Sequence, residues 1–187
     1  PKTWTGFLKE RGVTVVHVVS SVKFALKSEE AGVDAVVAEG FEAGGHNGRE
    51  ETTTFALIPM VKEKLSIPLI AAGGIATGRG MLAAMILGAD GVQVGSRFAA
   101  SVESSSHDKF KQAIIDAQDG DTHVTLKELA PVRLIKNKFI TLKKFQELKE
   151  KNVIVMCDVG AYGMSLSSNY NLRTKPIEIL IKGTKIK

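Results

Sequence analysis

Cysteine and aromatic residues are scarce in this chain of 187 residues. Cys157 is the single cysteine, which excludes an internal disulfide and fits a reducing compartment, so we expect a cytoplasmic location. No apolar run reaches the ~18–20 residues that cross a bilayer, and no signal-peptide pattern opens the chain, so no membrane association is predicted. Pro1 is not an initiator methionine, which leaves room for an N-terminus upstream.

Nucleic-acid and metal binding also lack support in the sequence. The net charge is +5, but its lysine-rich stretch, residues 136–151, is typical of an exposed helix face. Aromatic residues make up 6% of the chain, so no platform for stacking bases is evident. Four widely spaced histidines and one cysteine, without clustered carboxylates, form no recognisable metal-ligand set. We therefore predict no nucleic-acid partner and no metal site.

Strand and helix patterns alternate over the first hundred residues. Short apolar segments predict strands at 13–19, 34–40, 67–74 and 90–98, the first of them covered on both faces. Helices are predicted at 3–11, 20–32, 55–65, 77–88 and 104–120. Pro59 is expected in the first turn of its helix. Consecutive βα units favour an α/β fold with parallel strands joined by right-handed crossovers.

Beyond residue 120 this alternation is lost. Short extended pieces are predicted up to residue 139, a helix at 141–151, and strands at 153–162 and 176–183. The β-type pattern of the tail differs from the βα units before it. We therefore predict two domains, 1–139 and 140–187, the second a helix followed by a β-rich tail.

Glycines follow three of the predicted strands, at Gly40, Gly73-Gly74 and Gly95-Ser96. Parallel strands end at the same edge of a sheet, and that edge carries the sites of βα barrels and open α/β sheets. Glycine permits close backbone approach, and the N–H groups at the start of a following helix favour a phosphate. Tight βα turns also use glycine pairs for steric reasons alone, so both interpretations stay open.

A lone histidine stands in the glycine-rich loop "EGFEAGGHNG", residues 39–48. Imidazole titrates near neutrality, so His46 is a candidate general base. The alternative is a loop histidine with no task. Among the other histidines, His17 is expected as a buried core residue, His107 near a helix start and His123 in a loop.

Three linked segments, "AEGFEAGGHNG", "PLIAAGGIATGRG" and "GADGVQVGSRFAASVES", resemble the nitronate monooxygenase family. The family was formerly called 2-nitropropane dioxygenases, and flavin-dependent enoyl-ACP reductases are close relatives. The resemblance spans about residues 1–139. It implies the second half of a flavin-binding TIM-type βα barrel, with about four parallel strands.

The resemblance also implies an activity and a site. It implies an FMN-dependent oxidoreductase that oxidises nitronates or nitroalkanes with O2, and His46 would be the active-site base. The loop along the flavin would comprise Glu39, Gly40, Gly44 and Gly45, and the phosphate clamp would comprise Gly73, Gly74, Gly95 and Ser96. The alternatives are a flavin-dependent enoyl-ACP reductase, and a catalytically silent half barrel that keeps a phosphate-binding site.

The resemblance has two departures. The segment that supplies the first four strands of the family barrel is absent from this sequence, and four strands cannot close a barrel of the usual size. We therefore expect a homodimer, a partner that supplies the other half barrel, or instability. The tail, residues 152–187, resembles the C-terminal region of diaminopimelate decarboxylases instead.

Overall fold

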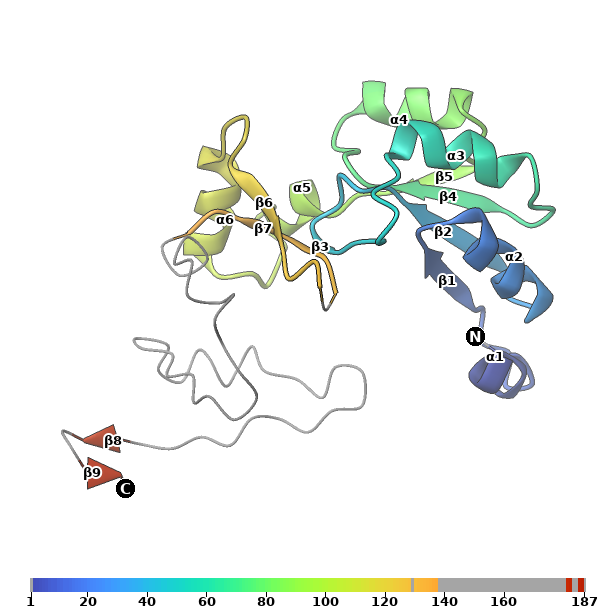
Figure 1. Ribbon diagram of the computed structural model, residues 1–187, viewed down its shortest axis with the longest axis horizontal. Helices are drawn as coiled ribbons and strands as arrows, with labels where there is room; N and C mark the ends of the chain where they lie inside the picture. Colours follow the sequence, from blue (N-terminus) through green and yellow to red (C-terminus); the bar gives the residue numbers. More distant parts are fainter. Residues whose placement is uncertain (1, 129, 138–180, 183–184, 187) are drawn as a thin grey trace. The chain divides into compact units, whose positions relative to one another are not determined.

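A computed structural model describes residues 2–128, 130–137, 181–182 and 185–186 (Figure 1). The chain divides into two units, Pro1–Thr141 and Leu142–Lys187. In the second unit, β8 (Ile181–Lys182) and β9 (Lys185–Ile186) form an antiparallel pair. The helix predicted at 141–151 and the strand predicted at 153–162 lie outside the described residues.

The first unit contains a four-stranded parallel sheet. Its strands are β1 (Val16–Val19), β2 (Ala35–Glu39), β4 (Leu69–Ala72) and β5 (Gly91–Gln93), in the order β1-β2-β4-β5. All three neighbouring pairs are parallel, in the registers that begin with Val16↔Ala35, Val36↔Leu69 and Ile70↔Gly91. The prediction of about four parallel strands is confirmed.

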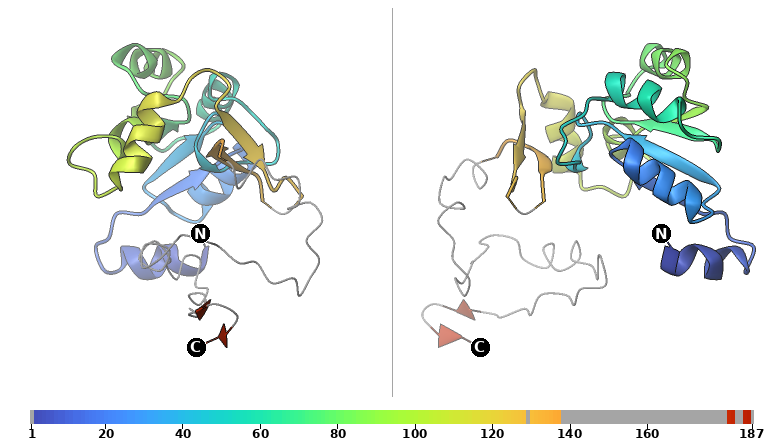
Figure 2. Two further views of the ribbon diagram at one scale, coloured as in Figure 1. Left: turned by 90° about the vertical axis from the view of Figure 1, so that its left-hand side faces the viewer. Right: turned by 45° about the vertical axis from the view of Figure 1, so that its right-hand side comes forward.

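Helices α2 (Val22–Glu30), α3 (Thr54–Lys62) and α4 (Gly78–Ile86) connect these strands. Helix α1 (Lys2–Lys9) precedes the sheet in the chain, and α5 (Ser96–Ala99) and α6 (Asp108–Asp116) follow it. The strands of the sheet follow chain order, so right-handed crossovers place α2, α3 and α4 on one face, as Figures 1 and 2 show. The Ser21 and Thr77 hydroxyls accept backbone N–H bonds and cap α2 and α4.

The hydrophobic core lies between this face of the sheet and the helices. β2 and β4 contribute alternate residues, including Val36 and Leu69, both fully buried. From the helix side, α3 contributes Leu57, Ile58 and Val61, which are at most 1% exposed. This three-residue cluster, spaced i, i+1 and i+4, holds α3 against the sheet.

The predictions for β1 and for Pro59 were wrong. β1 is not covered on both faces, because it is an edge strand of this sheet: Val16 and Val18 are 44% and 49% exposed, whereas Val19 belongs to the core. Pro59 lies inside α3, beyond its first turn. The carbonyl of Phe55 that Pro59 leaves without an N–H partner belongs to a residue 72% exposed, where water can solvate it.

Three histidines and the strand predicted at 90–98 can also be compared with the structure. His107 caps α6, with its Nδ1 accepting from the Lys109 N–H, as expected near a helix start. His123 lies in a strand rather than in a loop, and His17 is only partly buried, on the edge strand β1. The strand predicted at 90–98 ends at Gln93, because the chain turns into α5 at Ser96.

A small antiparallel sheet stands beside the parallel one. β3 (Gly45–His46), β6 (Thr122–Thr125) and β7 (Val132–Ile135) pair in the order β3-β7-β6. β6 and β7 form a hairpin, and β7 also pairs with the glycine loop through Gly45↔Arg133 and His46↔Val132. The short extended pieces predicted after residue 120 are therefore a hairpin that joins the loop carrying His46.

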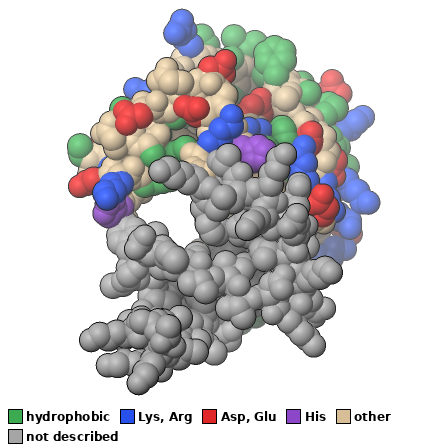
Figure 3. Space-filling model, turned by 60° about the vertical axis from the view of Figure 1, so that its left-hand side comes forward, with side chains coloured by type: hydrophobic (Ala, Val, Ile, Leu, Met, Phe, Trp, Pro, Cys, Tyr) green, Lys and Arg blue, Asp and Glu red, His purple; other side chains and the backbone are tan. Residues whose placement is uncertain are grey.

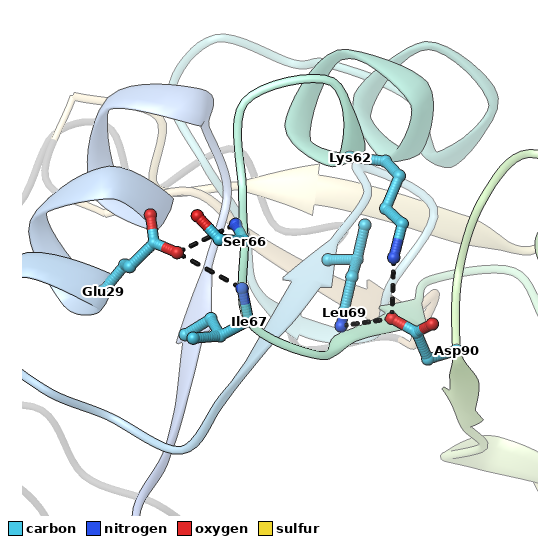
Figure 4. A network of polar contacts seen from close by, with 6 residues as sticks. All are labelled: Glu29, Lys62, Ser66, Ile67, Leu69 and Asp90. Carbon is cyan, nitrogen blue, oxygen red and sulfur yellow. Dashed lines mark hydrogen bonds and ion pairs between the residues drawn. The ribbon is translucent and has the colours of Figure 1, made fainter.

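Polar contacts bind the amino ends of the inner strands (Figure 4). The Glu29 carboxylate accepts from the backbone N–H groups of Ser66 and Ile67, at 2.8 and 3.2 Å. The Asp90 carboxylate accepts from the Leu69 N–H at 2.9 Å and from the Lys62 ammonium at 3.0 Å. These contacts lie at the end of the strands opposite to the glycine tips, so they serve stability rather than a site there.

Candidate functional site

A cavity of about 530 Å³ opens at the carboxyl ends of β2, β4 and β5. The last residues of these three strands, Glu39, Ala72 and Gln93, all line it. Its other walls are the loop after β2, the segment from Gly95 to Ala99, one side of α6 and the β6-β7 hairpin. This volume lies within the range of small-molecule and cofactor pockets.

The glycine pair after β4 is required by the backbone itself. Gly73 and Gly74 have φ of +98° and +69°, which L side chains rarely adopt. A Cβ on Gly73 would lie 2.8 Å from the carbonyl oxygen of Gly40. Both glycines line the cavity, so a tight turn and an exposed backbone occur at the same place.

The tip after β5 reaches the same cavity. Gly95 precedes the first turn of α5, and Gly95 and Ser96 both line the cavity. β4 and β5 are neighbours paired at Ala72↔Gln93, and this pairing brings the two tips together. Nothing lies within 4 Å of a Cβ built on Gly95, so the space beside it is open toward a ligand. The structure thus unites Gly73, Gly74, Gly95 and Ser96.

Gly40 has a different position from the other predicted site residues. It does not line the cavity, and a Cβ on it would lie 2.1 Å from Oγ1 and 2.3 Å from the backbone N of Thr54. Thr54 is buried, and its hydroxyl donates at 2.8 Å toward the carbonyl of Gly73. The absence of a side chain at Gly40 therefore lets α3 approach the end of β2 closely.

Glu39 is a partly buried carboxyl at the cavity wall. Burial raises the pKa of Glu39 above its usual value of 4.5, because removal from water disfavours the charged form. Glu39 is the last residue of β2, and its contact with a flavin stays a prediction.

Gly44 and Gly45 line the cavity, whereas His46 does not. His46 is exposed and lies on β3, directly after the lining residues. Gly45 has φ of +88°, so the loop turns sharply just before the histidine. The loop is tied at both ends, with the Phe41 N–H donating to the Thr52 carbonyl and the Asn47 N–H to that of Pro131. The loop that carries His46 is therefore held at both ends beside the cavity, although His46 itself does not line it.

Sequence reasoning missed Glu42 and Arg133, which also line the cavity. The Glu42 carboxylate accepts from the Thr54 N–H at 2.9 Å and so caps the start of α3. Arg133 donates to the carbonyl of Phe41 and to the Thr122 hydroxyl. No local motif marks either residue, since each depends on a partner more than ten positions away in the chain.

The described part of the chain contains neither a metal-ligand cluster nor a membrane-spanning helix. There, no three histidine, cysteine, aspartate or glutamate side chains gather in a way that could hold a metal ion. No helix in the same residues is long and apolar enough to cross a bilayer. On the face drawn in Figure 3, acidic and basic side chains of the described part are mixed, so the net positive charge forms no single basic patch there.

A family model described as nitronate monooxygenase matches residues 3–178. A probable nitronate monooxygenase of Staphylococcus saprophyticus is 42% identical over 143 residues, which are 71% of this chain and 40% of that protein. The chain thus spans about two fifths of the length of this curated relative. The family match continues into residues 152–178, and no comparison shows the resemblance to diaminopimelate decarboxylases that we expected there. That second resemblance falls mostly outside the described residues and stays a prediction.

Two solved structures share the fold. FabK from Thermotoga maritima has 48% sequence identity and a TM-score of 0.74, over 81% of this chain and 48% of that one. A nitroalkane oxidase from Streptomyces ansochromogenes has 31% identity and a TM-score of 0.67, over 74% of this chain and 43% of that one. The arrangement of strands and helices described above therefore occurs in known proteins.

Proposed function

The chain belongs to the nitronate monooxygenase family, and on that premise we propose that it forms the FMN-binding half of a flavin oxidoreductase acting on nitronates or nitroalkanes with O2. The family is flavin-dependent and its members are enzymes of the TIM-barrel type, as the resemblance of the sequence implies. We propose that the flavin is FMN, that the substrate is a nitronate or nitroalkane, and that the site residues are those described below. A cytoplasmic location stays a prediction.

One observation supports the proposal most. Two glycine tips from neighbouring strands line one cavity, and the space beside Gly95 is open, since a Cβ there would meet nothing within 4 Å. A phosphate dianion suits such a place, because backbone N–H groups at strand ends and helix starts favour negative charge. The cavity of about 530 Å³ has room for a flavin ring beside that phosphate. We place the phosphate of FMN at Gly73, Gly74, Gly95 and Ser96.

FMN supplies the electron transfer toward oxygen, and the residues of the chain supply position and proton transfer. Glu39, Gly44 and Gly45 form the wall along which a flat ring would lie. His46 would take the proton from the carbon next to the nitro group of a nitroalkane through a ring nitrogen. A nitronate has already lost this proton, so His46 would then orient the substrate instead.

A second candidate is an enoyl reductase, because the chain is 48% identical to the FabK structure. This reaction needs a nicotinamide cofactor as hydride donor. The sequence contains no separate dinucleotide fingerprint, which favours the first candidate.

The open edge of the parallel sheet at β1 indicates that another segment covers it in the active protein. β1 pairs with β2 alone among the described residues, and its Val16 and Val18 face away from the core. We propose that further βα units cover this edge in the active protein, from a second copy or from the missing N-terminal half barrel. Light scattering of the purified chain should show a dimer or a tendency to associate, and a stable monomer at all concentrations would exclude the second copy.

The activity is tested with the purified chain reconstituted with FMN. Turnover of propionate-3-nitronate with O2 consumption, and none of crotonyl thioester with NADH, is expected. The reverse pattern would favour the reductase. Flavin that binds without either activity would favour the catalytically silent half barrel, and a chain that takes up no flavin would contradict the proposal altogether.

A further inference from the structure

Arg133 connects the hairpin to the loop that carries His46. Its Nε and Nη2 both donate to the Phe41 carbonyl oxygen, at 3.1 and 3.0 Å. Its Nη1 donates to the Thr122 hydroxyl on the neighbouring strand at 3.0 Å. The guanidinium carbon also lies 4.9 Å from the centroid of the Phe41 ring. One planar group therefore spans both strands of the hairpin and the start of the loop.

The contacts of Arg133 join the β6-β7 hairpin to the start of the loop that carries His46. Phe41 follows Gly40 at the end of β2, and the loop from it reaches β3 at Gly45 and His46. β3 is only two residues long, and its pairing partner is β7, the strand that carries Arg133. A strand pair of only two residues fixes the pairing register of β3 and β7 weakly, so the loop needs additional contacts to keep one position.

We propose that Arg133 is a positioning residue, which holds the loop from Phe41 to His46 at the cavity margin and so sets the place of the imidazole. The role in catalysis rests on the proposed function, whereas the hold on the loop does not. Arg133 also lines the cavity. Loss of the guanidinium hydrogen bonds would therefore alter both the wall of the cavity and the position of His46 relative to a bound substrate.

The shape of the guanidinium matters here, beyond its charge. Three of its five N–H groups donate to protein acceptors, and two of these converge on one carbonyl. A lysine ammonium is a compact point charge and cannot reproduce this planar fork. A cation that served only to attract an anionic substrate would tolerate lysine. The two roles therefore separate in the Arg133→Lys variant.

Arg11 is a matched control. Its Nη1 donates to the Phe7 carbonyl at 3.0 Å, and its guanidinium carbon lies 3.5 Å from the centroid of the Phe7 ring. The same kinds of contact thus occur within and just after α1, none of whose residues lines the cavity. Arg11→Lys removes a comparable contact at a place where no site loop depends on it.

Hydrogen exchange of the cofactor-free chain tests the hold on the loop. In Arg133→Lys and Arg133→Gln, exchange at the Ala43 and Asn47 amides should rise about tenfold or more, since hydrogen bonds to charged groups contribute on this scale. The Val36 amide, bonded to the Pro68 carbonyl in the core, should keep its rate and so reports that the fold is intact. Arg11→Lys should leave the loop unchanged. Loop rates equal to those of the unmodified chain in both Arg133 variants would overturn the proposal.

Kinetics of the FMN-loaded chain then test positioning. We expect kcat for nitroalkanes to fall at least tenfold in Arg133→Lys with KM changed much less, because a misplaced imidazole affects proton transfer more than binding. Full rescue by lysine, with KM raised only in Arg133→Gln, would overturn positioning in favour of anion attraction. If the unmodified chain turns over no nitroalkane, the proposed function fails, and the exchange experiment still decides whether Arg133 holds the loop.

Discussion

Replacement of Gly40 by alanine separates a packing role from a cofactor-binding role. The added Cβ would stand 2.1 Å from Thr54 Oγ1, 2.3 Å from its N and 2.6 Å from its Cα, where ordinary contact begins at 3.4 Å. Two of these three atoms are backbone, so no side-chain rotation relieves the clash. The start of α3 would have to move away from the end of β2.

The cost of Gly40→Ala follows from what this movement breaks. Overpacking costs about 1–3 kcal/mol, and the displaced Thr54 also loses its contacts to Gly73 and to the Glu42 carboxylate, worth about 1–3 kcal/mol each. The lower limits of these three terms add up to about 3 kcal/mol, so we expect the free energy of unfolding to fall by at least about 3 kcal/mol, a large part of the usual 5–15 kcal/mol.

Urea denaturation followed by circular dichroism measures this change. Gly44→Ala is the matched control, because nothing lies within 4 Å of a Cβ at that position and its φ is not in the left-handed region. We expect Gly44→Ala to stay within about 0.5 kcal/mol of the unmodified chain. A Gly40→Ala protein of unchanged stability that merely fails to bind FMN would refute the packing role and return Gly40 to the cofactor site.

Three further predictions concern ionisable residues. The Leu69 N–H and the Lys62 ammonium hold the pKa of the Asp90 carboxyl below its usual value of 3.8. The ionised carboxylate therefore stabilises the folded state above pH 3.8, and this stability is lost as the pH falls through the lowered native pKa. An acid titration of unfolding should show less of this loss in Asp90→Asn than in the control Asp119→Asn. Burial raises the pKa of the Glu39 carboxyl above 4.5, so its ionisation destabilises the folded state as the pH rises. Glu39→Gln should therefore be more stable than the unmodified chain at pH 7 but not near pH 4, and a variant less stable at pH 7 would contradict this. His46→Ala should lose at least a hundredfold in nitroalkane turnover while FMN stays bound by fluorescence titration, since general base catalysis contributes roughly 10²–10⁴-fold; unchanged turnover would remove the histidine from the mechanism.

Local patterns were sufficient for the parallel sheet and for the two glycine tips. Apolar runs such as "PLIAAGG" combine a buried strand with a turn that only glycine satisfies, so both the strand and its end can be read from adjacent residues. The exposure of β1 could not be read in this way. Val16 and Val18 carry the composition of a buried strand, and only the position of β1 at the edge of the sheet leaves them exposed.

The role of Gly40 and the presence of Arg133 depend on long-range contacts. Gly40 meets Thr54, and Arg133 meets Phe41, 92 residues away in the chain. Neither pair has a sequence period or spacing that would reveal it. The resemblance to the family placed Gly40 in the loop along the flavin, and the close packing of α3 is the competing reason for a glycine at this position.

Comparison of FMN with riboflavin is the most direct test of the phosphate clamp. The two ligands share the ring system and differ in the phosphate that we place at Gly73, Gly74, Gly95 and Ser96. Several charge-assisted hydrogen bonds should make FMN bind at least about a hundredfold more tightly than riboflavin in a fluorescence titration of the purified chain. Equal dissociation constants for the two flavins would contradict the assignment of these strand tips to a phosphate.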